Sequence, residues 1–491
     1  MLLTIKYPSG HYLGDKKVHL PKQSKYFDGD YLNEDFTLHK RSEKIFLGIG
    51  KDKTVYIPRL NEYYSTYTIC LPNYVYTVKP EPNNSGKVII VQQFTHIQSI
   101  DSQLYMKLFF PELNYTPKEI DLTPVMTLHK ELENHPNPIN VMSIDPGVNF
   151  AKDVDDAISF EIKDDMYLHV SVHIADVSRY LDCYTDDICM NVETIYTTTQ
   201  VYHMLPIELM KMCSLNENEN HYAVTIEFVF NLYDKTYISH NIYRSIVRNI
   251  HSMTYDEADR LISADSKFDM LFNFINNLSI NENKTISSLF QRTSFYYIDG
   301  KIVRVNNNTP SHILIEKLMI LANHYVHQEV VKNGEFLIHR FHPASEIEPT
   351  KITDVKKALY SPKSGHYALG LDIYNHFTSP IRRYMDVCIH RSLFNKKVQY
   401  DFSKEESLEA YNHKKELIKL ASRTEYTFQV FRYLTSKIGT DFEYQIIDIK
   451  EKYYQIYLPE VNLYTTFSTD NELTPRLKLT GVNLVKLRLY F

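Results

Sequence analysis

The sequence predicts an α+β protein in which a central region of mixed helices and strands is flanked by small β-barrel modules. Two observations lead to this prediction. Short runs of β-branched and aromatic residues, broken by turn residues, fill the chain up to about residue 138 and return after about residue 437. Between them both the strand period of two and the helix period of 3.6 occur. We therefore expect three domains, at residues 1–140, 141–436 and 437–491.

Composition excludes several classes of protein. With 491 residues the chain is too long for one core, and 43% hydrophobic and 23% charged residues are ordinary for a soluble globular protein. A net charge of -6 means that any nucleic-acid site must be local. Five scattered cysteines without a C-x-x-C pair argue against a disulfide framework and a zinc site. No apolar run reaches the ~18 residues of a membrane span, so we expect a cytoplasmic protein without a membrane.

The flanking segments show strand patterns. In the N-terminal segment, residues 54–57, 74–78 and 87–91 predict strands, and residues 80–86 predict a turn. One or two small barrels fit this segment best, and residues 131–138 provide a domain boundary. The C-terminal segment has strand patterns at 444–449 and 484–489, which is enough for a short barrel of the OB type.

The central region contains both kinds of element. Residues 167–175 alternate like a strand. Apolar residues recur with helical spacing at Ile315, Leu318, Met319, Ala322 and Val326.

The most informative stretch is residues 143–158, which contains Asp145, Asp153, Asp155 and Asp156. Carboxylates gathered at one site raise each other's pKa unless a cation stabilises them. Hard oxygen ligands point to Mg²⁺, with Mn²⁺ as the alternative, and paired divalent ions hydrolyse phosphodiesters. An EF-hand is excluded, because the glycine and glutamate that its loop needs are absent. The alternative is a solvated turn that happens to be acidic.

A second stretch lies far downstream. Ser379 followed by Pro380 predicts the start of a helix, with Arg382 and Arg383 in its first turn. Cations are unfavourable there, so a phosphate is expected to bind, with Asp386 holding Arg382. The alternative is an ordinary Arg-Asp pair on the surface.

Two further features could be functional, but each also has an ordinary structural interpretation. Tyr196 offers a face for stacking a base, but with 39 tyrosines a core or surface role is commoner for any one of them. His339, His342 and His390 lack the spacing of a metal motif, and core histidines with satisfied hydrogen bonds are the better interpretation.

Taken together, these stretches resemble the catalytic RNB domain of the ribonuclease II family of processive 3′-to-5′ exoribonucleases. The likeness covers about residues 140 to 435 and lies in these segments: 144–146, 151–158, 172–178, 204–206, 213–216, 319–323 and 376–391.

The resemblance implies hydrolysis of single-stranded RNA from its 3′ end to nucleoside 5′-monophosphates. It implies metal binding by Asp145, Asp153, Asp155 and Asp156, with the last three and Arg382 as catalytic residues. The RNA-binding residues that we expect, from the resemblance and from the phosphate site above, are Tyr196, Phe290, Ser379, Arg382 and Arg383. It also implies that the flanking modules are OB-type or cold-shock-like and lead single strands to the site. We expect a monomer.

The sequence departs from the family at three places. A two-residue insertion around Val148 and Asn149 lengthens the spacing after Asp145, residues 197–199 are threonines, and Ser422 replaces a glutamate of some members. Two alternatives remain. One is a catalytically silent RNB-fold protein that binds RNA or scaffolds a complex, and the other is a metal-dependent DNA exonuclease.

Overall fold

The computed structural model of the chain forms two compact units. The central unit comprises Leu113–Tyr296 and Arg304–Ser422, and the flanking unit comprises Met1–Glu112, Tyr297–Val303 and Arg423–Phe491. The structure describes the chain apart from residues 1–2, 7–9, 14–15, 19–26, 28, 34–37, 59, 61, 117, 134, 146–152, 279–292, 299–300, 335, 346–354, 451–452 and 469–473.

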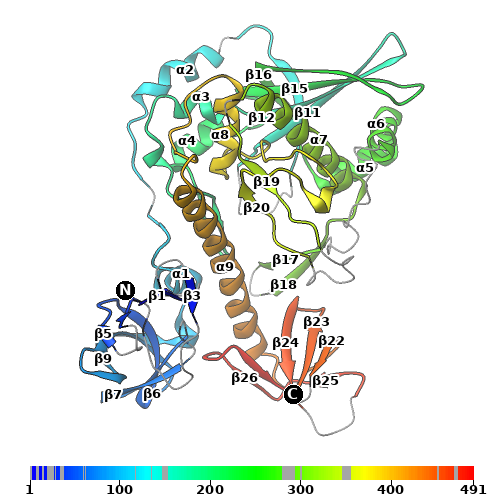
Figure 1. Cartoon of the computed structure of the whole chain (residues 1–491). Coiled ribbons are helices and arrows are strands. Elements are labelled where there is room, and N and C mark those ends of the chain that lie inside the picture. Colours follow the sequence, from blue (N-terminus) through cyan, green and yellow to red (C-terminus); the bar gives the residue numbers. More distant parts are fainter. Residues whose placement is uncertain are drawn as a thin grey trace. The chain divides into compact units, whose positions relative to one another are not determined.

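A closed β-barrel forms the core of the central unit (Figure 1). Its strands, in the order in which they pair, are β10 (Ile139–Asp145), β11 (Asp156–Lys163), β12 (Tyr167–Ala175), β15 (Asn220–Asn231) and β16 (Tyr237–Thr254). The strand expected at residues 167–175 is confirmed as β12. Neighbouring strands are antiparallel except β10 and β16, which run parallel and close the barrel. Asp145 and Asp156 thus stand at the last residue of β10 and the first of β11.

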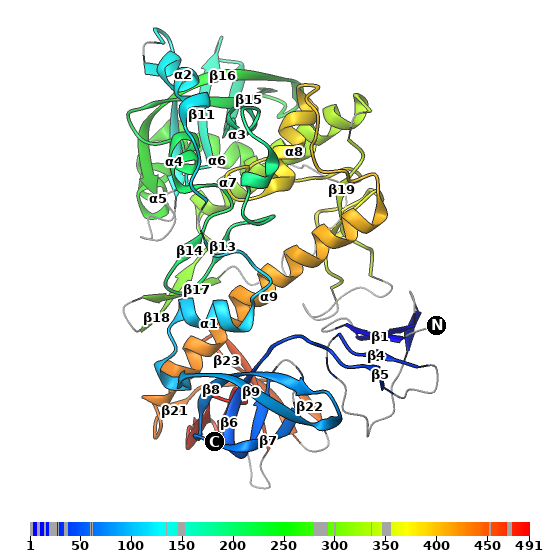
Figure 2. The same cartoon turned by 90° about the vertical axis from the view of Figure 1, so that its left-hand side faces the viewer.

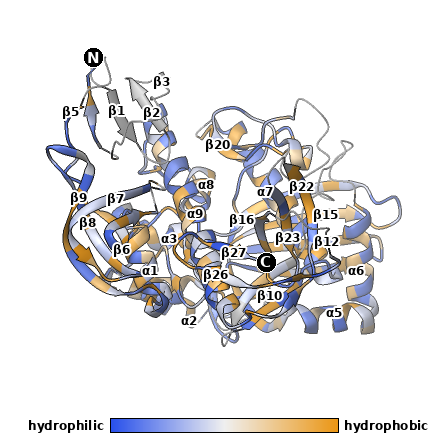
Figure 3. Cartoon of the chain, turned by 90° about the horizontal axis from the view of Figure 1, so that it is seen from below, coloured by the Kyte–Doolittle hydropathy of each residue, from blue (hydrophilic) through white to orange (hydrophobic). Residues whose placement is uncertain are grey.

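Helices surround this barrel. They are α2 (Thr123–Glu133), α3 (Val177–Leu181), α4 (Ile207–Cys213), α5 (Tyr255–Ala264), α6 (Ser266–Asn277), α7 (Pro310–Lys332) and α8 (Tyr384–Leu393). The predicted helical pattern is confirmed in α7, which packs on the barrel where Tyr325 meets Phe228 of β15, with ring centroids 5.5 Å apart. Hydrophobic and hydrophilic residues alternate along α6 (Figure 3), whose buried face carries Leu271, Phe274 and Ile275.

Short hairpins complete the central unit. They are formed by β13 (Ile195–Tyr196) with β14 (Val201–Tyr202) and by β19 (His339–Phe341) with β20 (Leu359–Ser361). A further two-stranded sheet pairs β17 (Thr293–Ile298) with β18 (Lys301–Asn306), and these strands have residues in both units. The long helix α9 (Glu405–Thr435) has residues in both units.

The N-terminal part of the flanking unit contains a sheet and a barrel. The sheet is formed by β1 (Leu3–Lys6), β2 (Gly10–Leu13), β3 (Lys16–Val18), β4 (Tyr31–Leu32) and β5 (Leu38–Lys40). The closed barrel, visible in Figure 2, is formed by β6 (Phe46–Ile57), β7 (Glu62–Cys70), β8 (Tyr74–Glu81) and β9 (Asn84–His96), and α1 (Ser102–Phe109) follows it. The three strands expected at residues 54–57, 74–78 and 87–91 are confirmed within β6, β8 and β9.

The C-terminal part of the flanking unit is also β-rich. Its strands are β21 (Asp441–Phe442), β22 (Gln445–Lys450), β23 (Tyr453–Leu458), β24 (Leu463–Phe467), β25 (Leu477–Lys478), β26 (Gly481–Asn483) and β27 (Arg488–Tyr490). The strand expected at 444–449 corresponds to β22, but the strand expected at 484–489 is wrong. Residues 484–487 form a turn, in which Asn483 Oδ1 accepts hydrogen bonds from Val485 N and Lys486 N and Leu487 has a φ of 44°.

No helix within the described part of the chain is long and apolar enough to span a membrane.

Candidate active site

The structure brings the two distant stretches together at one carboxylate. Ile381 N donates to Asp155 Oδ1 at 2.8 Å, and Arg382 Nε donates to Asp155 Oδ2 at 3.2 Å. Asp155 is 5% exposed, whereas the side chain of Arg382 is 43% exposed, so the charge-assisted pair joins a buried carboxylate to a guanidinium that water reaches. The geometry therefore joins the acidic stretch to the arginine segment within the central unit.

Backbone hydrogen bonds hold the acidic stretch in place. Val154 N donates to Ser214 Oγ at 2.9 Å, and Leu215 N donates to Val154 O at 3.0 Å. Asp155 O accepts from Ala175 N at 2.9 Å, at the last residue of β12. Two separate segments, at residues 214–215 and at Ala175, thus fix the backbone of Val154 and Asp155.

The arginine segment differs from the prediction. The helix does not begin at Ser379 and Pro380 but at Tyr384, after a turn in which Arg383 N donates to Ser379 O at 3.0 Å. Arg383 is extended, with φ −136° and ψ 121°, because it pairs with Glu193 in an antiparallel bridge. Extended backbone cannot continue a helical turn, so α8 starts one residue later.

Asp386 also has a different role from the one predicted. Its Oδ1 accepts from Ser379 N and from Arg383 Nη2, both at 2.8 Å, and its side chain is fully buried. Arg382 instead donates from Nη2 to Ser379 Oγ at 2.9 Å. Arg382 is therefore held by Ser379 and Asp155, and Asp386 holds Arg383.

Tyr196 lies beside the acidic stretch. It ends β13, and the turn to β14 is closed by Thr197 N donating to Gln200 O at 3.0 Å. Its hydroxyl donates to Asp153 Oδ2 at 3.1 Å, and 37% of the residue is exposed. The three threonines from Thr197 therefore form the hairpin turn. An exposed part of the tyrosine remains available to a ligand.

Burial dominates the electrostatics of the aspartates. It raises the pKa of Asp155 well above its usual range, although Arg382 opposes the shift. It raises the pKa of Asp156 to about 6; Arg382 opposes this shift as well, and Asp145 adds to it. Crowded, desolvated carboxylates of this kind are stabilised as anions by a nearby cation.

The donor set fits a hard divalent cation, although the described residues do not enclose one. No three His, Cys, Asp or Glu side chains in the described ranges are gathered closely enough to hold an ion. Asp153 Oδ1, however, is buried and has no hydrogen-bond partner among the described residues. An unsatisfied buried carboxylate oxygen is costly, and a metal ion would satisfy it.

Some predicted features cannot be placed. Phe290 lies outside the described residues, as does the insertion around Val148 and Asn149. Ser422 lies in α9, at the last residue of the central unit.

The histidines noted in the sequence have contacts within the fold. His390 Nε2 lies 3.0 Å from Phe377 O, and His339 Nδ1 lies 3.0 Å from His327 Nε2. The His342 ring lies 5.1 Å from that of His366.

The sequence analysis missed three residues near the site. Glu193 pairs with the arginine segment through the backbone. Burial lowers the pKa of His203, and the nearby charge of Asp153 opposes that shift. Burial raises the pKa of Tyr255, and the charges of Asp156 and Asp145 add to the shift. None of them belongs to a motif, and a single Glu, His or Tyr gives no local signal.

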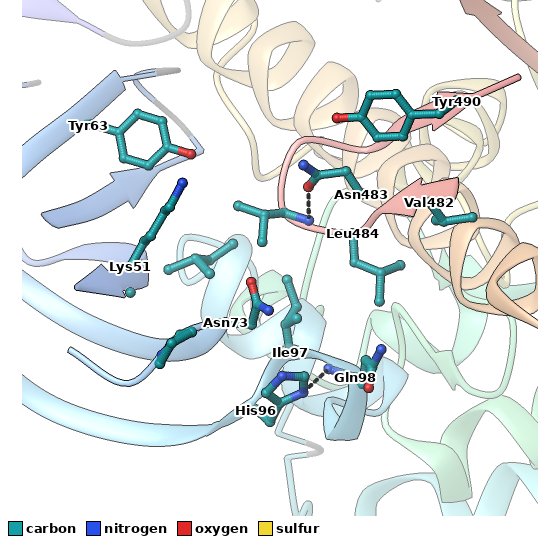
Figure 4. A pocket seen from close by; sticks show the side chains of 14 residues that line it. Lys51, Tyr63, Asn73, His96, Ile97, Gln98, Val482, Asn483, Leu484 and Tyr490 are labelled. Atoms are coloured by element: carbon teal, nitrogen blue, oxygen red, sulfur yellow. Dashed lines mark hydrogen bonds between the residues drawn. The ribbon is translucent and has the colours of Figure 1, made fainter. Parts of the chain in front are cut away.

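A separate cavity of about 410 Å³ lies in the flanking unit (Figure 4). Residues of the β6–β9 barrel, including Lys51, Tyr63 and His96, line it together with Asn483 and Tyr490. None of the predicted site residues is among its lining.

Comparison with known proteins agrees with the geometry. The RNB domain family matches residues 137–359 and 350–396, which together make up just over half of the chain. The chain belongs to the RNB family. The predicted resemblance is thereby confirmed, and the α+β class with flanking barrels is confirmed by the fold.

Individual relatives extend this result. Ribonuclease R of Aquifex aeolicus is 27% identical over 438 residues, covering 73% of this RNB-family chain but only 61% of that protein. The structure of Mycoplasma genitalium RNase R in complex with ribose methylated single-stranded RNA matches with a TM-score of 0.74 at 18% identity, over 99% of both chains. Yeast Ssd1, a pseudonuclease, matches with a TM-score of 0.61 at 13% identity, over 88% of this chain and 66% of that one. The RNB fold is therefore shared by nucleases and by a protein without nuclease activity.

Proposed function

We propose that this chain is a metal-dependent 3′-to-5′ exoribonuclease that hydrolyses single-stranded RNA to nucleoside 5′-monophosphates. The observation that carries the proposal is the contact of Arg382 and Ile381 with Asp155, which joins the arginine expected to bind phosphate to a cluster of carboxylates. Ribonuclease R relatives support the same activity.

Within this proposal Asp145, Asp153, Asp155 and Asp156 would hold Mg²⁺, with Mn²⁺ as the alternative. The bound metal would activate water and stabilise the leaving oxygen of the phosphodiester. The side chains of the chain itself supply the rest. Arg382, oriented by Ser379 Oγ and Asp155, offsets the negative charge that develops on the scissile phosphate.

Binding would use stacking and phosphate contacts. The exposed part of Tyr196 would pack on the 3′-terminal nucleotide, and Phe290 would add a second stacking face. Ser379 and Arg383 would assist Arg382 with the backbone phosphates. Because stacking is tolerant of sequence, degradation would be largely independent of base identity.

Further expectations remain predictions within this proposal. They are the domain limits 1–140, 141–436 and 437–491, RNA binding by the flanking modules, a monomeric state and a cytoplasmic location.

A labelled RNA tests the activity. Single-stranded RNA carrying a 5′ label, incubated with Mg²⁺, is expected to shorten from its 3′ end and release monophosphates, whereas a circular RNA of the same sequence stays intact. Arg382→Ala should lower kcat by about 100- to 1000-fold, as expected for loss of one preorganised charge. The matched control is Arg260→Ala, an exposed arginine of α5, which should leave kcat unchanged.

Two outcomes would favour the alternatives. Binding of RNA without release of monophosphate, under any divalent metal, would indicate a silent RNB-fold protein. Degradation of DNA and RNA of equal sequence at similar rates would indicate a general exonuclease.

A further inference from the structure

Three cations gather beside the arginine segment of the central unit. Lys415 of α9 and Arg340 of β19 both lie over the ring of the fully buried Tyr360, at 5.8 and 5.0 Å from its centroid. Arg383 interacts electrostatically with the same tyrosine. Cations in so small a region repel one another unless anions compensate them.

Glu193 provides one of those anions. Its Oε1 lies 3.7 Å from Lys415 Nζ, and the two side chains are only 18% and 14% exposed. Burial raises the pKa of Glu193, whereas Lys415, Arg383 and Arg340 all favour its ionised form. The other carboxylate, Asp386, is bound to Arg383 at 2.8 Å. Three cations thus face two carboxylates, and the cluster keeps an excess positive charge.

Several buried polar atoms of this cluster of cations and carboxylates have no hydrogen-bond partner among the described residues. Glu193 Oε1 is buried and accepts no hydrogen bond, since 3.7 Å is too long for one. Arg340 Nη1 and Arg383 Nε are also buried, and they donate to no group that the structure describes. Buried guanidinium donors without acceptors favour an added oxyanion, because phosphate oxygens form strong charge-assisted hydrogen bonds with them.

This cluster adjoins the proposed catalytic arginine. Thr194 N donates to Arg382 O at 2.9 Å and Tyr384 N donates to Val192 O at 3.0 Å, on either side of the bridge between Glu193 and Arg383. Glu193 is therefore opposite the residue that follows Arg382. The cluster thus lies one residue along the backbone from Arg382, whose side chain is 43% exposed.

We propose that Glu193 limits the affinity for RNA by competing with an RNA phosphate for Lys415, Arg383 and Arg340. The inference rests on the proposed function, because it assigns an RNA phosphate as the competing anion. An ionised Glu193 offsets part of the cationic charge in the free protein, and binding of the phosphate must overcome that interaction. Glu193 thus tunes binding and release without touching the reacting atoms.

Removing the charge of Glu193 tests the competition. Binding of a fluorescent single-stranded RNA is measured by anisotropy between about 50 and 200 mM KCl. An Asp156→Asn background prevents degradation. Glu193→Gln is expected to bind about threefold to tenfold more tightly, with a salt slope steeper by about 0.7, the value for one further phosphate contact on a single strand. A merely structural role would weaken binding instead.

Matched variants separate this effect from net charge. Glu416→Gln removes the same charge from α9, the helix that carries Lys415, but from a solvent-accessible pair with Lys357 at 2.9 Å, and it should bind like the parent. Lys415→Gln should weaken binding and flatten the salt slope. If Glu193→Gln does not fold, Lys415→Gln decides the question.

Two results would overturn the inference. One is binding by folded Glu193→Gln that is no tighter than that of the parent, and the other is a Lys415→Gln variant with an unchanged salt slope. Failure of the proposed function is distinguishable, because wild-type protein would then release no monophosphate from RNA, whether or not it binds the strand. If wild type degrades RNA and only Glu193→Gln fails to tighten binding, the competition alone is wrong.

Discussion

At the scale of single residues, the hydroxyl and the ring of Tyr196 have separable tasks. The hydroxyl donates to Asp153 Oδ2, while the other carboxylate oxygen of Asp153 has no hydrogen-bond partner in the part of the chain that the structure describes. A side chain that hydrogen-bonds a metal-binding carboxylate orients it, and losing such a partner typically costs about 10- to 100-fold in metal affinity or activity.

Tyr196→Phe is therefore expected to lower the affinity for Mn²⁺ by about tenfold, measured by electron paramagnetic resonance without RNA. The length of the shortest RNA that remains after degradation should stay unchanged, because the variant keeps the ring that would pack on the 3′-terminal nucleotide. Tyr196→Ala serves as the comparison and should change both quantities. If the phenylalanine variant binds Mn²⁺ like wild type, the hydroxyl does not orient Asp153.

At the scale of elements, α7 holds the loop that leads into the arginine segment. Asn323, 4% exposed, accepts from Phe377 N through Oδ1 at 2.6 Å and donates from Nδ2 to Tyr374 Oη at 3.1 Å. One amide thus ties the helix to two residues just before Ser379. Its removal would leave a buried backbone N–H without a partner.

Asn323→Ala is expected to lower the free energy of unfolding by about 1 to 3 kcal/mol, the cost of an unsatisfied buried group. Urea unfolding followed by fluorescence measures it. Asn333→Ala, at the exposed end of the same helix, is the control and should change stability by less than about 0.5 kcal/mol. Equal effects in the two variants would contradict a holding role for Asn323.

At the scale of the whole molecule, buried neutral histidines link stability to pH. Burial lowers the pKa of His173, His327 and His366 to about 3 and that of His221 to about 4. The unfolded chain has a histidine pKa near 6.5, so it binds protons that the folded protein does not. Their contribution is present above pH 6.5 and is lost as the pH falls below that value.

The free energy of unfolding should therefore fall below pH 6.5, by up to about 1.4 kcal/mol per pH unit for each of these histidines. Urea titrations at pH 7.5, 6.5 and 5.5 measure the slope. His173→Gln, which keeps a polar group near Ser159 and Thr225, should reduce it by about one such increment. A slope that is the same in both proteins would show that His173 is protonated in the folded state.

The sequence by itself determined the family, the strand β12, the pattern of α7 and the cluster of aspartates. These features are local: a period of two or 3.6, or carboxylates a few positions apart, can be found without knowing the fold. The acidic run also indicated a metal site, because carboxylates gathered together raise each other's pKa unless a cation stabilises their charged forms.

Only the tertiary structure decided which groups meet. It paired Arg382 with Asp155 rather than with Asp386, extended Arg383 and delayed the start of α8. It also placed Glu193 among cations of β19 and α9. Local rules favoured a helix at Pro380, but backbone pairing with residues 192–194 required an extended chain at Arg383. Contacts between residues far apart in sequence depend on how the barrel and helices pack, which no short-range pattern encodes.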